Sequence, residues 1–519
     1  MIIEGNDYSA DSNSSEFDVV VVGAGIVGLY MAARLLKDNP KRNICIVESG
    51  AITPEMESNK KNAVSIGQVH NGTLNGRYSG LGGGSFKWGG QLAEFEESDF
   101  ERPDFKWPMG YGEVNAHYKE VYSFLGIKNS FSDTFFNKIY NNKDKESSKI
   151  ESYYTVRLKD RNTEFSTYFE KEIHGKALTI VVNTTAYKIN FKEKHANALL
   201  CKTKEGKYIS IKGDRFIFAS GTLGINQFFL STQALYEVPW KHNTFIGKYF
   251  QDHLGGVVAK LKVRNEKMFR NAFEKKMVNG IKIERKLKFR KSYRKKMLNG
   301  VVVFFKYETK QYERIDRFRS FIRQLKNDRK LNNSRAFVKD FYRIRGYVFS
   351  FFTKLVFKRQ LHEAFDKNGI LVFAQSEQVP TAQSQITISK DKMLENGLFK
   401  ICVNWAWVGK EIEAIQSIVF ELKEYLKEQN IGDVEIYPEI KEGNPSVLTT
   451  FRDTNHQCGG MMMSSSEKDG VVDSDCKVWG TDNVWVAGAA VFPSSGHANS
   501  TLTALAIAER TIQNSFTPK

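Results

Sequence analysis

The chain has 519 residues, of which 41% are hydrophobic and 26% are charged, and this composition excludes a protein that is disordered throughout. The length predicts two or three domains at roughly 100–200 residues each. No apolar run reaches about 18 residues and the first fifteen residues do not resemble a signal peptide, so we expect a cytoplasmic protein. Five scattered cysteines without a CxxC pair indicate neither a disulfide framework nor a metal site.

The positive charge of the chain is concentrated in one segment. The net charge is +17, but residues 264–360 alone hold 30 Lys and Arg against 8 Asp and Glu. Within this segment, cations alternate with aromatic and aliphatic residues at 289–297, 314–330 and 342–359. Such a pattern suits an anionic membrane surface, where each cation adds up to about 1 kcal/mol, so we expect peripheral binding to the inner face of a membrane. A solvated basic face and an acidic protein partner are the alternatives, and nucleic acid is disfavoured because no binding module accompanies the charge.

In chain order, the predicted elements begin with a flexible tail over residues 1–15. Phe17–Val22 is a short run rich in β-branched residues, which predicts a buried strand, and residues 26–38 have helical spacing. Ile44–Val47 predicts a second buried strand. Together these elements predict a β–turn–α–β unit of about thirty residues.

The later elements alternate in type along the chain. Strand-like runs recur at 178–189 and 214–220, and residues 361–450 combine strands with one amphipathic helix, Glu411 to Gln429. A buried strand at 484–492 and a helix from about Thr501 follow. Nucleotide-type features therefore lie at both ends and in the middle, as in a domain whose loops carry an inserted second domain.

A glycine fingerprint lies between the first predicted strand and helix. Gly23 permits a tight turn, Gly25 lets the backbone approach a pyrophosphate, and Gly28 lets helix and strand pack closely. The pyrophosphate then lies at the helix N-terminus, where free N–H groups favour anions. Glu48 ends the second strand, where a carboxylate accepts bonds from ribose hydroxyls and repels a 2′-phosphate. The pattern predicts FAD or NAD rather than NADP; the alternative is a glycine-rich turn in a plain α/β protein.

A second glycine cluster spans Gly80 to Gly90, with six glycines in eleven residues. Ordering so much glycine costs backbone entropy, which makes sense where main chain must lie against a flat ligand. A flexible loop is the alternative interpretation of this cluster.

Several motifs occur in the order of one known family. They are FDVVVVGAGIVGLYMAARLL at 17–36, GGGSFKWGG at 82–90, ASGTLGINQFFLST at 219–232, IGKYFQDH at 246–253, EQVPTAQSQITIS at 377–389, HQCGG at 456–460 and the stretch 470–511 with ANSTLTA. With them the chain resembles the glucose–methanol–choline (GMC) flavin oxidoreductases, closest in motif style to the pyranose oxidase and sugar dehydrogenase branch. The resemblance implies FAD and hydride abstraction from a carbon that bears a hydroxyl.

The resemblance also implies roles for individual residues. His456, in the HxxGG/T motif, is the expected base, and Asn499, near the start of the last helix, is its expected partner. His497, two positions before Asn499, is expected to point elsewhere, unless a shift of register relative to the family motif exchanges the two residues. His253 is expected to be structural. The residues expected to contact the cofactor are Gly23, Gly25, Gly28, Glu48, Gly83, Gly84, Ser85, Trp88, Gly488 and Thr501.

The chemistry explains these residue types. Oxidising an alcohol removes a hydroxyl proton and a hydride from the same carbon. A neutral imidazole, whose ordinary pKa is about 6.5, takes the proton, and an amide holds the oxygen. The hydride goes to flavin N5, and the helix that begins near Asn499–Thr501 directs its positive end at the charge gained around N1.

Two positions depart from the family pattern. Lys87 stands where flavin-linked relatives have a His that carries the flavin covalently, so we expect non-covalent FAD. Met462-Met463-Ser464 replaces the usual Arg-Met-Gly, which changes the surroundings of the flavin or the substrate.

We therefore expect an α/β fold in which a split FAD-binding Rossmann-type domain carries an inserted α+β substrate domain with an antiparallel sheet. The first comprises residues 16–100, 170–260 and 450–519, and the second 101–169 and 261–449, including the basic insertion 264–360. The expected function is oxidation of a hydroxyl of a sugar or lipid-linked glycoside, by a dehydrogenase rather than an oxidase, with a quinone or O2 as acceptor. The alternatives are a redox-silent FAD-containing lyase of the same family, and a membrane- or polyanion-binding protein with structural FAD.

Overall fold

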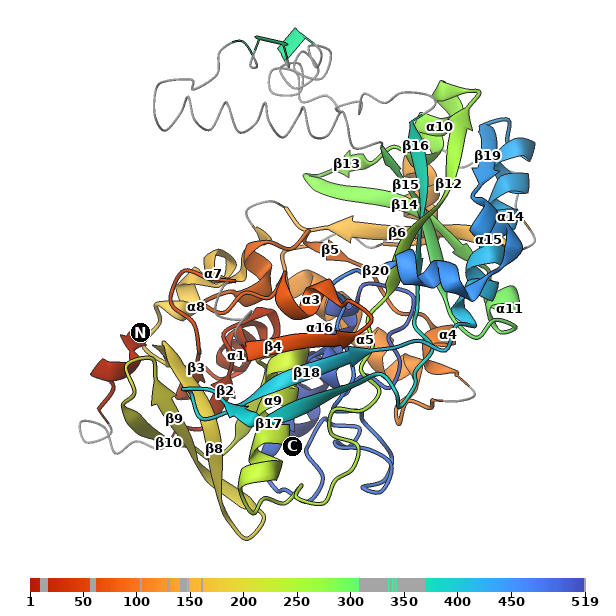
Figure 1. Cartoon of the computed structure of the whole chain (residues 1–519). Helices are drawn as coiled ribbons and strands as arrows, with labels where there is room; N and C mark the ends of the chain where they lie inside the picture. The colour runs from red at the N-terminus through yellow and green to blue at the C-terminus, as the bar shows by residue number, and fades with distance from the viewer. Residues whose placement is uncertain are drawn as a thin grey trace.

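The computed structural model describes residues 1–517 apart from 10–16, 57–61, 103–104, 128–130, 141–146, 148, 160–161, 308–334, 336–337, 340 and 343–368. In this part of the chain, a parallel sheet of six strands and an antiparallel sheet of nine strands form two regions of the molecule (Figure 1). The α/β fold expected from the sequence is confirmed. No helix among the described residues is long and apolar enough to cross a membrane.

The parallel sheet is built from segments spread along the whole chain. Its order is β1 (Ile2–Glu4), β7 (Leu178–Val182), β3 (Ile44–Val47), β2 (Val19–Val22), β11 (Phe216–Phe218) and β21 (Val484–Val486). The four residues of β2 are buried valines, as expected of a parallel strand that is covered on both faces. β2 pairs with β3 on one side and with β11 on the other, so the strand order switches direction at β2, and ligands of such sheets bind outside the carboxyl ends of the strands at this point.

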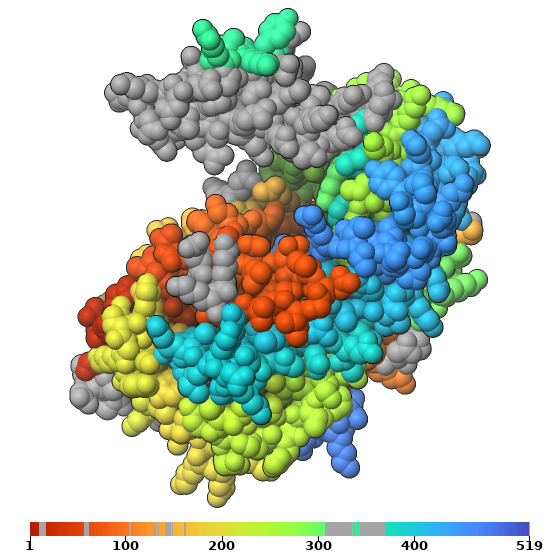
Figure 2. All heavy atoms as spheres, viewed as in Figure 1, coloured from red at the N-terminus to blue at the C-terminus, as the bar shows by residue number. Residues whose placement is uncertain are grey.

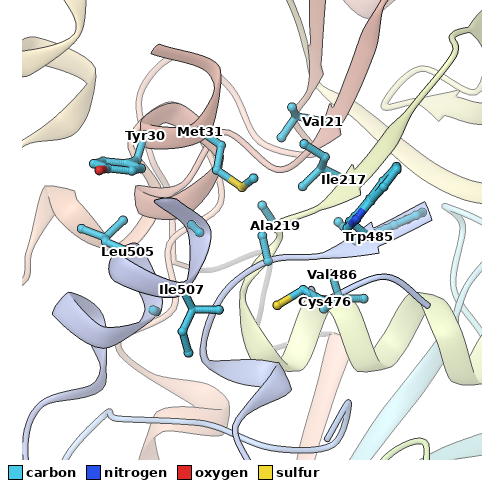
Figure 3. Close-up of a cluster of buried hydrophobic side chains, with 14 of the residues drawn as sticks. Val21, Tyr30, Met31, Ile217, Ala219, Cys476, Trp485, Val486, Leu505 and Ile507 are labelled. Atoms are coloured by element: carbon cyan, nitrogen blue, oxygen red, sulfur yellow. The ribbon is translucent and has the colours of Figure 1, made fainter. Parts of the chain in front are cut away.

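Three helices follow strands of this sheet: α1 (Ile26–Asp38), α9 (Gly221–Leu235) and α16 (Ser500–Ser515). α1 packs on α16, and the hydroxyl of Tyr30 donates to Glu509 at 2.8 Å between them. Figure 3 shows Val21 and Ile217 of the sheet in the same buried cluster as Leu505 of α16. The β–α–β unit predicted at the N-terminus is confirmed by β2, α1 and β3.

The antiparallel sheet has the order β19 (Gly432–Ile436), β12 (Leu254–Val263), β16 (Ile370–Ser376), β15 (Val301–Tyr307), β14 (Ile281–Phe289), β6 (Ile150–Arg157) and β5 (Gln91–Leu92), with β13 (Lys276–Val278) on β14 and β20 (Arg452–Asp453) on β12. Helix α14 (Glu411–Glu428) packs on β6, β15 and β16 and buries Ile415, Ile418 and Leu422 in this core. Because side chains alternate along a strand, every second residue of β14, β15 and β16 points to the other face. That face meets the residues of the candidate site.

Two smaller sheets complete the described strands. One contains β10 (Tyr208–Lys212), β9 (His195–Thr203) and β8 (Thr184–Lys192), and the other β17 (Gln385–Met393), β18 (Phe399–Trp405) and β4 (Ala63–Gly67). β4 pairs in parallel with β18, and Figure 2 shows these orange and cyan segments side by side on the surface. The short helices are η1 (Gly5–Asp7), α3 (Asn71–Leu74), η2 (Gly83–Phe86), α4 (Glu97–Phe100), α6 (Asp133–Tyr140), α7 (Phe165–Tyr168), α8 (Glu170–Ile173), α10 (Glu266–Phe273), α11 (Lys291–Arg294), α15 (Pro438–Glu442), η4 (Pro445–Thr450) and η5 (Ala489–Val491).

Two segments differ from the sequence expectation. Residues 1–15 are predicted to be a flexible tail, but Ile2–Glu4 form β1, because this short apolar run pairs with the open edge of β7. Helix α5 (Tyr111–Phe124) lies in the range assigned to the substrate domain, yet it packs on α16 beside the parallel sheet. The predicted membrane-binding stretches at 314–330 and 342–359 lie almost wholly outside the described residues.

Candidate active site

The glycine loop after β2 has the geometry that the fingerprint requires. Gly23 has a φ of +106°, and a Cβ there would lie 2.7 Å from the Cα of Ser220. A Cβ on Gly28 would lie 2.0 Å from the carbonyl oxygen of Gly23, so α1 can approach the loop only with glycine at this position. A Cβ on Gly25 would meet nothing within 4 Å. Gly25 therefore borders open space at the N-terminus of α1, which no side chain caps and which suits an anion.

The second glycine loop lies directly against the first. A Cβ on Gly83 would lie 2.9 Å from the Cα of Gly25, and the N–H of Gly82 donates to the carbonyl of Ala24 at 2.8 Å. A Cβ on Gly84 would meet nothing within 4 Å. The two loops therefore form one cradle in which bare main chain faces open space.

Glu48 joins these two loops. Its Oε2 accepts the N–H of Ala24 at 2.7 Å, and its Oε1 accepts those of Gly50 and Gly80 at 2.8 and 2.9 Å. Burial raises the pKa of Glu48, and the backbone donors oppose this rise. A carboxylate has about four acceptor positions, so Oε2 retains room for a ribose hydroxyl. The ribose contact stays a prediction, whereas the loop-joining role could not be read from the sequence.

Ser85 and Trp88 shape the second loop through contacts with the protein itself. The hydroxyl of Ser85 donates to the carbonyl of Gly82 at 2.6 Å and accepts the N–H of Phe165 at 3.0 Å. The indole of Trp88 donates to the carbonyl of Thr163 at 2.6 Å. Their side-chain polar atoms therefore hold the loop in place, and their contact with the cofactor stays a prediction.

Gly488 and Thr501 are the two predicted cofactor contacts in the C-terminal part of the chain. Gly488 has a φ of +121°, and a Cβ there would lie 3.9 Å from the side chain of Val27 at the start of α1. Thr501 lies in the first turn of α16, which begins at Ser500. The predicted helix start is confirmed, with Asn499 as the N-cap residue.

His456 contacts a second histidine. Its Nδ1 lies 3.0 Å from Nδ1 of His253 and 2.8 Å from the hydroxyl of Thr454. Nε2 of His253 faces the carbonyl oxygens of Ser495 and Gly496 at 3.3 and 2.9 Å, and a carbonyl can only accept. His253 therefore carries its proton on Nε2 and accepts at Nδ1, so Nδ1 of His456 must donate.

Both imidazoles are held in the neutral form. Burial lowers the pKa of His253, and burial together with His253 and the Lys286 charge lowers the pKa of His456 to about 3. A neutral His456 with its proton on Nδ1 has a free electron pair on Nε2. No described residue forms a hydrogen bond with this atom, so Nε2 is available as a base.

Asp252 fixes the loop that carries His456. Its Oδ1 accepts the N–H groups of Thr454 and His456 at 3.2 and 2.9 Å, and its Oδ2 lies 3.2 Å from Nε2 of His70. Burial would raise the pKa of Asp252, but the contact with His70 outweighs it and the pKa is lowered. His70, Asp252 and Asp453 bring potential metal ligands within 4.8 Å of one another, yet both oxygens of Asp453 already accept backbone N–H groups.

The segment 251–253, which contains Asp252 and His253, also holds the loop that leads to Asn499. Gln251 accepts the N–H of Ser495 at 3.0 Å, and Nε2 of His253 donates to Gly496. Residues 251–253 therefore connect the two loops that carry the predicted catalytic residues. Of this motif, His253 is predicted to be only structural, and its contact with His456 is a link that sequence reasoning missed.

The side chain of Asn499 is used for contacts other than helix capping. Its Nδ2 donates to Oε1 of Gln91 at 3.3 Å, and its Oδ1 accepts from Nε2 of Gln375 at 3.5 Å. No capping hydrogen bond is formed by this side chain. Gln91 and Gln375 come from strands β5 and β16, so the antiparallel sheet positions the amide.

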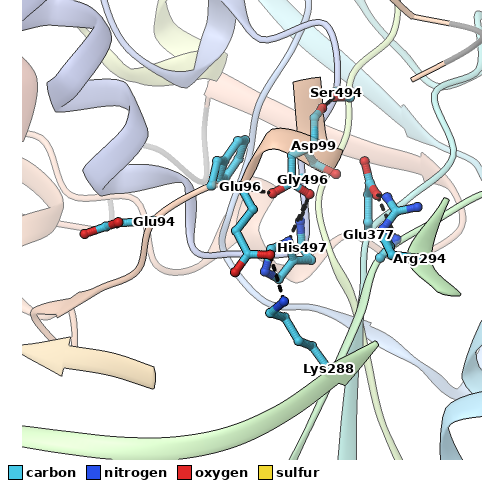
Figure 4. A network of polar contacts seen from close by, with 12 residues as sticks. Glu94, Glu96, Asp99, Lys288, Arg294, Glu377, Ser494, Gly496 and His497 are labelled. Atoms are coloured by element: carbon cyan, nitrogen blue, oxygen red, sulfur yellow. Dashed lines mark hydrogen bonds and ion pairs between the residues drawn. The ribbon is translucent and has the colours of Figure 1, made fainter. Parts of the chain in front are cut away.

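His497 belongs to a separate polar network, shown in Figure 4. Its Nδ1 lies 2.9 Å from Oδ1 of Asp99, and its ring packs edge-on against Tyr153. Burial would raise the pKa of Asp99, but the imidazole outweighs it and lowers the pKa to about 2. Asn499, two residues on, contacts Gln91 and Gln375 instead, and its assignment as the partner of His456 stays a prediction.

A cavity of about 510 Å³ lies elsewhere, at the amino-terminal edge of the parallel sheet. Asp214, Asp473, Asp475 and Asp482 are among its lining residues. The four carboxylates outnumber the two cations of the lining, Arg215 and Lys477, which disfavours a pyrophosphate, and ligands of such sheets bind at the opposite edge. This cavity is therefore not the dinucleotide site.

Comparison with known proteins supports the resemblance seen in the sequence motifs. Residues 380–508, which include both His456 and Asn499, match the family model of the GMC oxidoreductases. This C-terminal region is therefore a GMC oxidoreductase domain. A comparison with curated protein sequences gives no match.

Solved structures share this fold along nearly the whole chain. Pyridoxine 4-oxidase from Mesorbium loti has 15% identity and a TM-score of 0.60 over 97% of this chain and 100% of its own. A formate oxidase from Aspergillus oryzae has 15% identity and a TM-score of 0.55 over 97% and 99%. An FAD-dependent oxidoreductase from Chaetomium thermophilum has 14% identity and a TM-score of 0.55 over 96% and 98%.

FAD is the cofactor of this family, and the glycine cradle fits it. Gly25 and Gly84 leave open space beside the uncapped N-terminus of α1, where a pyrophosphate would lie. Glu48 is placed at the end of β3, as a ribose-binding carboxylate requires. Lys87, at the position where flavin-linked relatives carry a His, has its ammonium 4.7 Å from the ring centroid of Phe86, and non-covalent attachment stays a prediction.

Proposed function

We propose that the protein oxidises a hydroxyl group of a sugar or lipid-linked glycoside, with His456 as the base. One observation carries this proposal: the contacts of His253 place the His456 proton on Nδ1 and leave Nε2 free. The same motif, residues 251–253, also holds the loop that ends at Asn499. This shared support for both loops favours a base and an amide donor that act on the same substrate.

Each side chain has a defined part in this reaction. Nε2 of His456 takes the hydroxyl proton, and Asn499 holds the oxygen as negative charge develops on it. The carbon–hydrogen bond breaks with both electrons leaving as hydride, and the product is a carbonyl. FAD, when bound, supplies the hydride acceptor at N5. Asp252 and His253 contribute by holding the base in position.

The electron acceptor needs a separate measurement. The expectation of a dehydrogenase rests on membrane contact alone, and two of the solved neighbours are named as oxidases. These names give the expectation no support. Reoxidation of the reduced enzyme by O2 and by a soluble quinone, compared in the same buffer, measures which acceptor is used.

Anaerobic visible spectra test the proposed oxidation. Wild-type holoenzyme is mixed with a panel of sugars and alcohols, and bleaching of the flavin band by one of them is expected. In His456→Ala, the rate of bleaching should fall by roughly 10²–10⁴-fold while FAD content is unchanged. A flavin band that no hydroxyl compound bleaches supports the redox-silent lyase or a structural FAD, and bleaching at the wild-type rate in His456→Ala removes His456 as the base.

We also propose that the basic insertion, residues 264–360, binds an anionic membrane surface. Part of its first basic stretch, residues 289–297, forms ion pairs within the protein instead. Three cations there form ion pairs: Lys291 with Glu97, Arg294 with Glu377 and Lys295 with Glu101. The remaining cations of 314–330 and 342–359 carry the proposal. Flotation with anionic and neutral liposomes at low salt tests it, and an enzyme that stays unbound to both contradicts it.

A further inference from the structure

A row of side chains on the antiparallel sheet adjoins the candidate site. Phe304 of β15 pairs in register with Phe373 of β16, and their ring centroids are 5.1 Å apart. The ammonium of Lys286, on β14, lies 4.4 Å from the centroid of Phe304. The ammonium of Lys306 lies 3.3 Å from the centroid of Phe373. Two positive charges therefore flank one pair of aromatic rings.

This row is connected to the catalytic amide through one shared atom. Oε1 of Gln91 accepts from Nδ2 of Asn499 at 3.3 Å and from Nζ of Lys286 at 3.5 Å. The charge of Lys286 also contributes to the low pKa of His456. Lys286 therefore lies beside the place where the hydroxyl of the substrate is proposed to bind.

Among the described residues, the Glu284 carboxylate attracts both lysines of this row but forms an ion pair with neither. Lys286 is only 4% exposed, and neither Lys286 nor Lys306 has a carboxylate within ion-pair distance in the described part of the chain. Glu284 is nearby, but it is 3.7 Å from Lys275 and accepts from Gln91 at 2.8 Å.

The pKa values of the two lysines reflect this shortage of negative charge. Burial lowers the pKa of Lys286, and burial together with the Lys286 charge lowers that of Lys306 to about 8, although the Glu284 carboxylate opposes both changes. Burying an ammonium such as that of Lys286 without an ion-pair partner is costly, and the exposed Lys306 adds a second positive charge that solvent can reach, so this row is suited to an anion supplied from outside.

We propose that the substrate of this enzyme carries an oxyanion group, a carboxylate or a phosphate, which binds at Lys286 and Lys306. The apolar side of the substrate then lies against Phe304 and Phe373, and its hydroxyl faces His456 and Asn499. Because Lys286 and Asn499 share Gln91, the anion and the reacting hydroxyl belong to one compact molecule, such as a sugar acid or a sugar phosphate. This inference rests on the proposed oxidation and specifies its substrate class.

Anion binding is measured on the holoenzyme without turnover. Acetate and inorganic phosphate are titrated separately, and the difference spectrum of the flavin reports each Kd; the tighter of the two distinguishes a carboxylate from a phosphate site. Lys286→Met and Lys306→Met should each raise the Kd about tenfold or more, since a charged hydrogen bond contributes about 1.5–3 kcal/mol. Lys262→Met, which removes an exposed lysine of the same sheet, is the matched control and should leave the Kd unchanged.

Turnover is then compared between neutral and anionic compounds. Glucuronate and glucose 6-phosphate should reduce the flavin at lower concentration than glucose, and Lys306→Met should remove this advantage. Equal Kd values in wild type and both lysine variants, or no preference for the anionic compounds, overturn the inference while the oxidation stands. Lysine-dependent anion binding without any flavin reduction leaves the anion site intact and counts against the proposed oxidation instead.

Discussion

A single proton decides whether His456 can act as a base, and His253 sets its position. The two imidazoles are 203 positions apart in the chain, so no local pattern connects them. The HQCGG motif predicts the base, and the last helix predicts Asn499, because both resemble family motifs. The QDH motif carries no sign that its histidine contacts another histidine, and only the folded chain shows the contact.

The first prediction at this scale concerns His253 as a positioning residue. His253→Ala should lower kcat by about tenfold and move the acid limb of the kcat/KM profile to higher pH, because His253 lowers the pKa of His456. In His253→Asn, the amide can accept from His456 and donate to Gly496, so much of kcat should return. If alanine and asparagine have the same kcat and the same pH profile, the tautomer argument is wrong.

The second prediction concerns stability in acid. His456 and His253 stay neutral in the fold because their pKa values are lowered, whereas the unfolded chain binds protons at these histidines below about pH 6.5. Stability should therefore fall as pH decreases from 6.5 toward 4, by about 1.4 kcal/mol per pH unit from His456. Guanidinium unfolding at pH 7.5 and 5 measures this loss. His456→Gln should reduce the loss and the exposed control His242→Gln should not; equal losses in both contradict the assignment.

At the scale of elements, local sequence patterns predicted those helices, strands and turns that depend on residues adjacent in the chain. The GxGxxG spacing and the apolar run before it placed β2, α1 and the turn between them, and a cap residue placed the start of α16. Gln91, Gln375 and Lys286 could not be predicted as site residues. Each is an ordinary polar position on a strand, and only the register of the antiparallel sheet brings them to Asn499.

Two glycines of the same loop should respond differently to one methyl group. Gly28→Ala places a Cβ 2.0 Å from the Gly23 carbonyl, so α1 must move and the protein should lose about 1–3 kcal/mol of stability together with FAD. Gly25→Ala meets nothing within 4 Å, so the apoprotein should keep its Tm and lose only FAD affinity. Calorimetry and FAD titration of both variants check this contrast; a destabilised Gly25→Ala apoprotein would contradict the cradle.

At the scale of the whole molecule, the predicted division into a split FAD-binding domain and an inserted substrate domain fits the two large sheets better than it fits the helices. The motifs at both ends and in the middle predicted a split domain, and the parallel sheet does collect strands from across the chain. The predicted boundaries could not anticipate α5, which packs on α16, or β4, which pairs with β18. Such contacts depend on apolar faces that fit only after folding.

The outermost strand of the parallel sheet, β21, begins at Val484, and α16 follows it. The glycine loops are therefore synthesised long before β21, which pairs with β11 beside them in the parallel sheet. We expect tight binding of FAD only after β21 and α16 have joined the fold. A fragment that stops before Asn499 should keep the residues of the cradle and lack the proposed amide partner of His456.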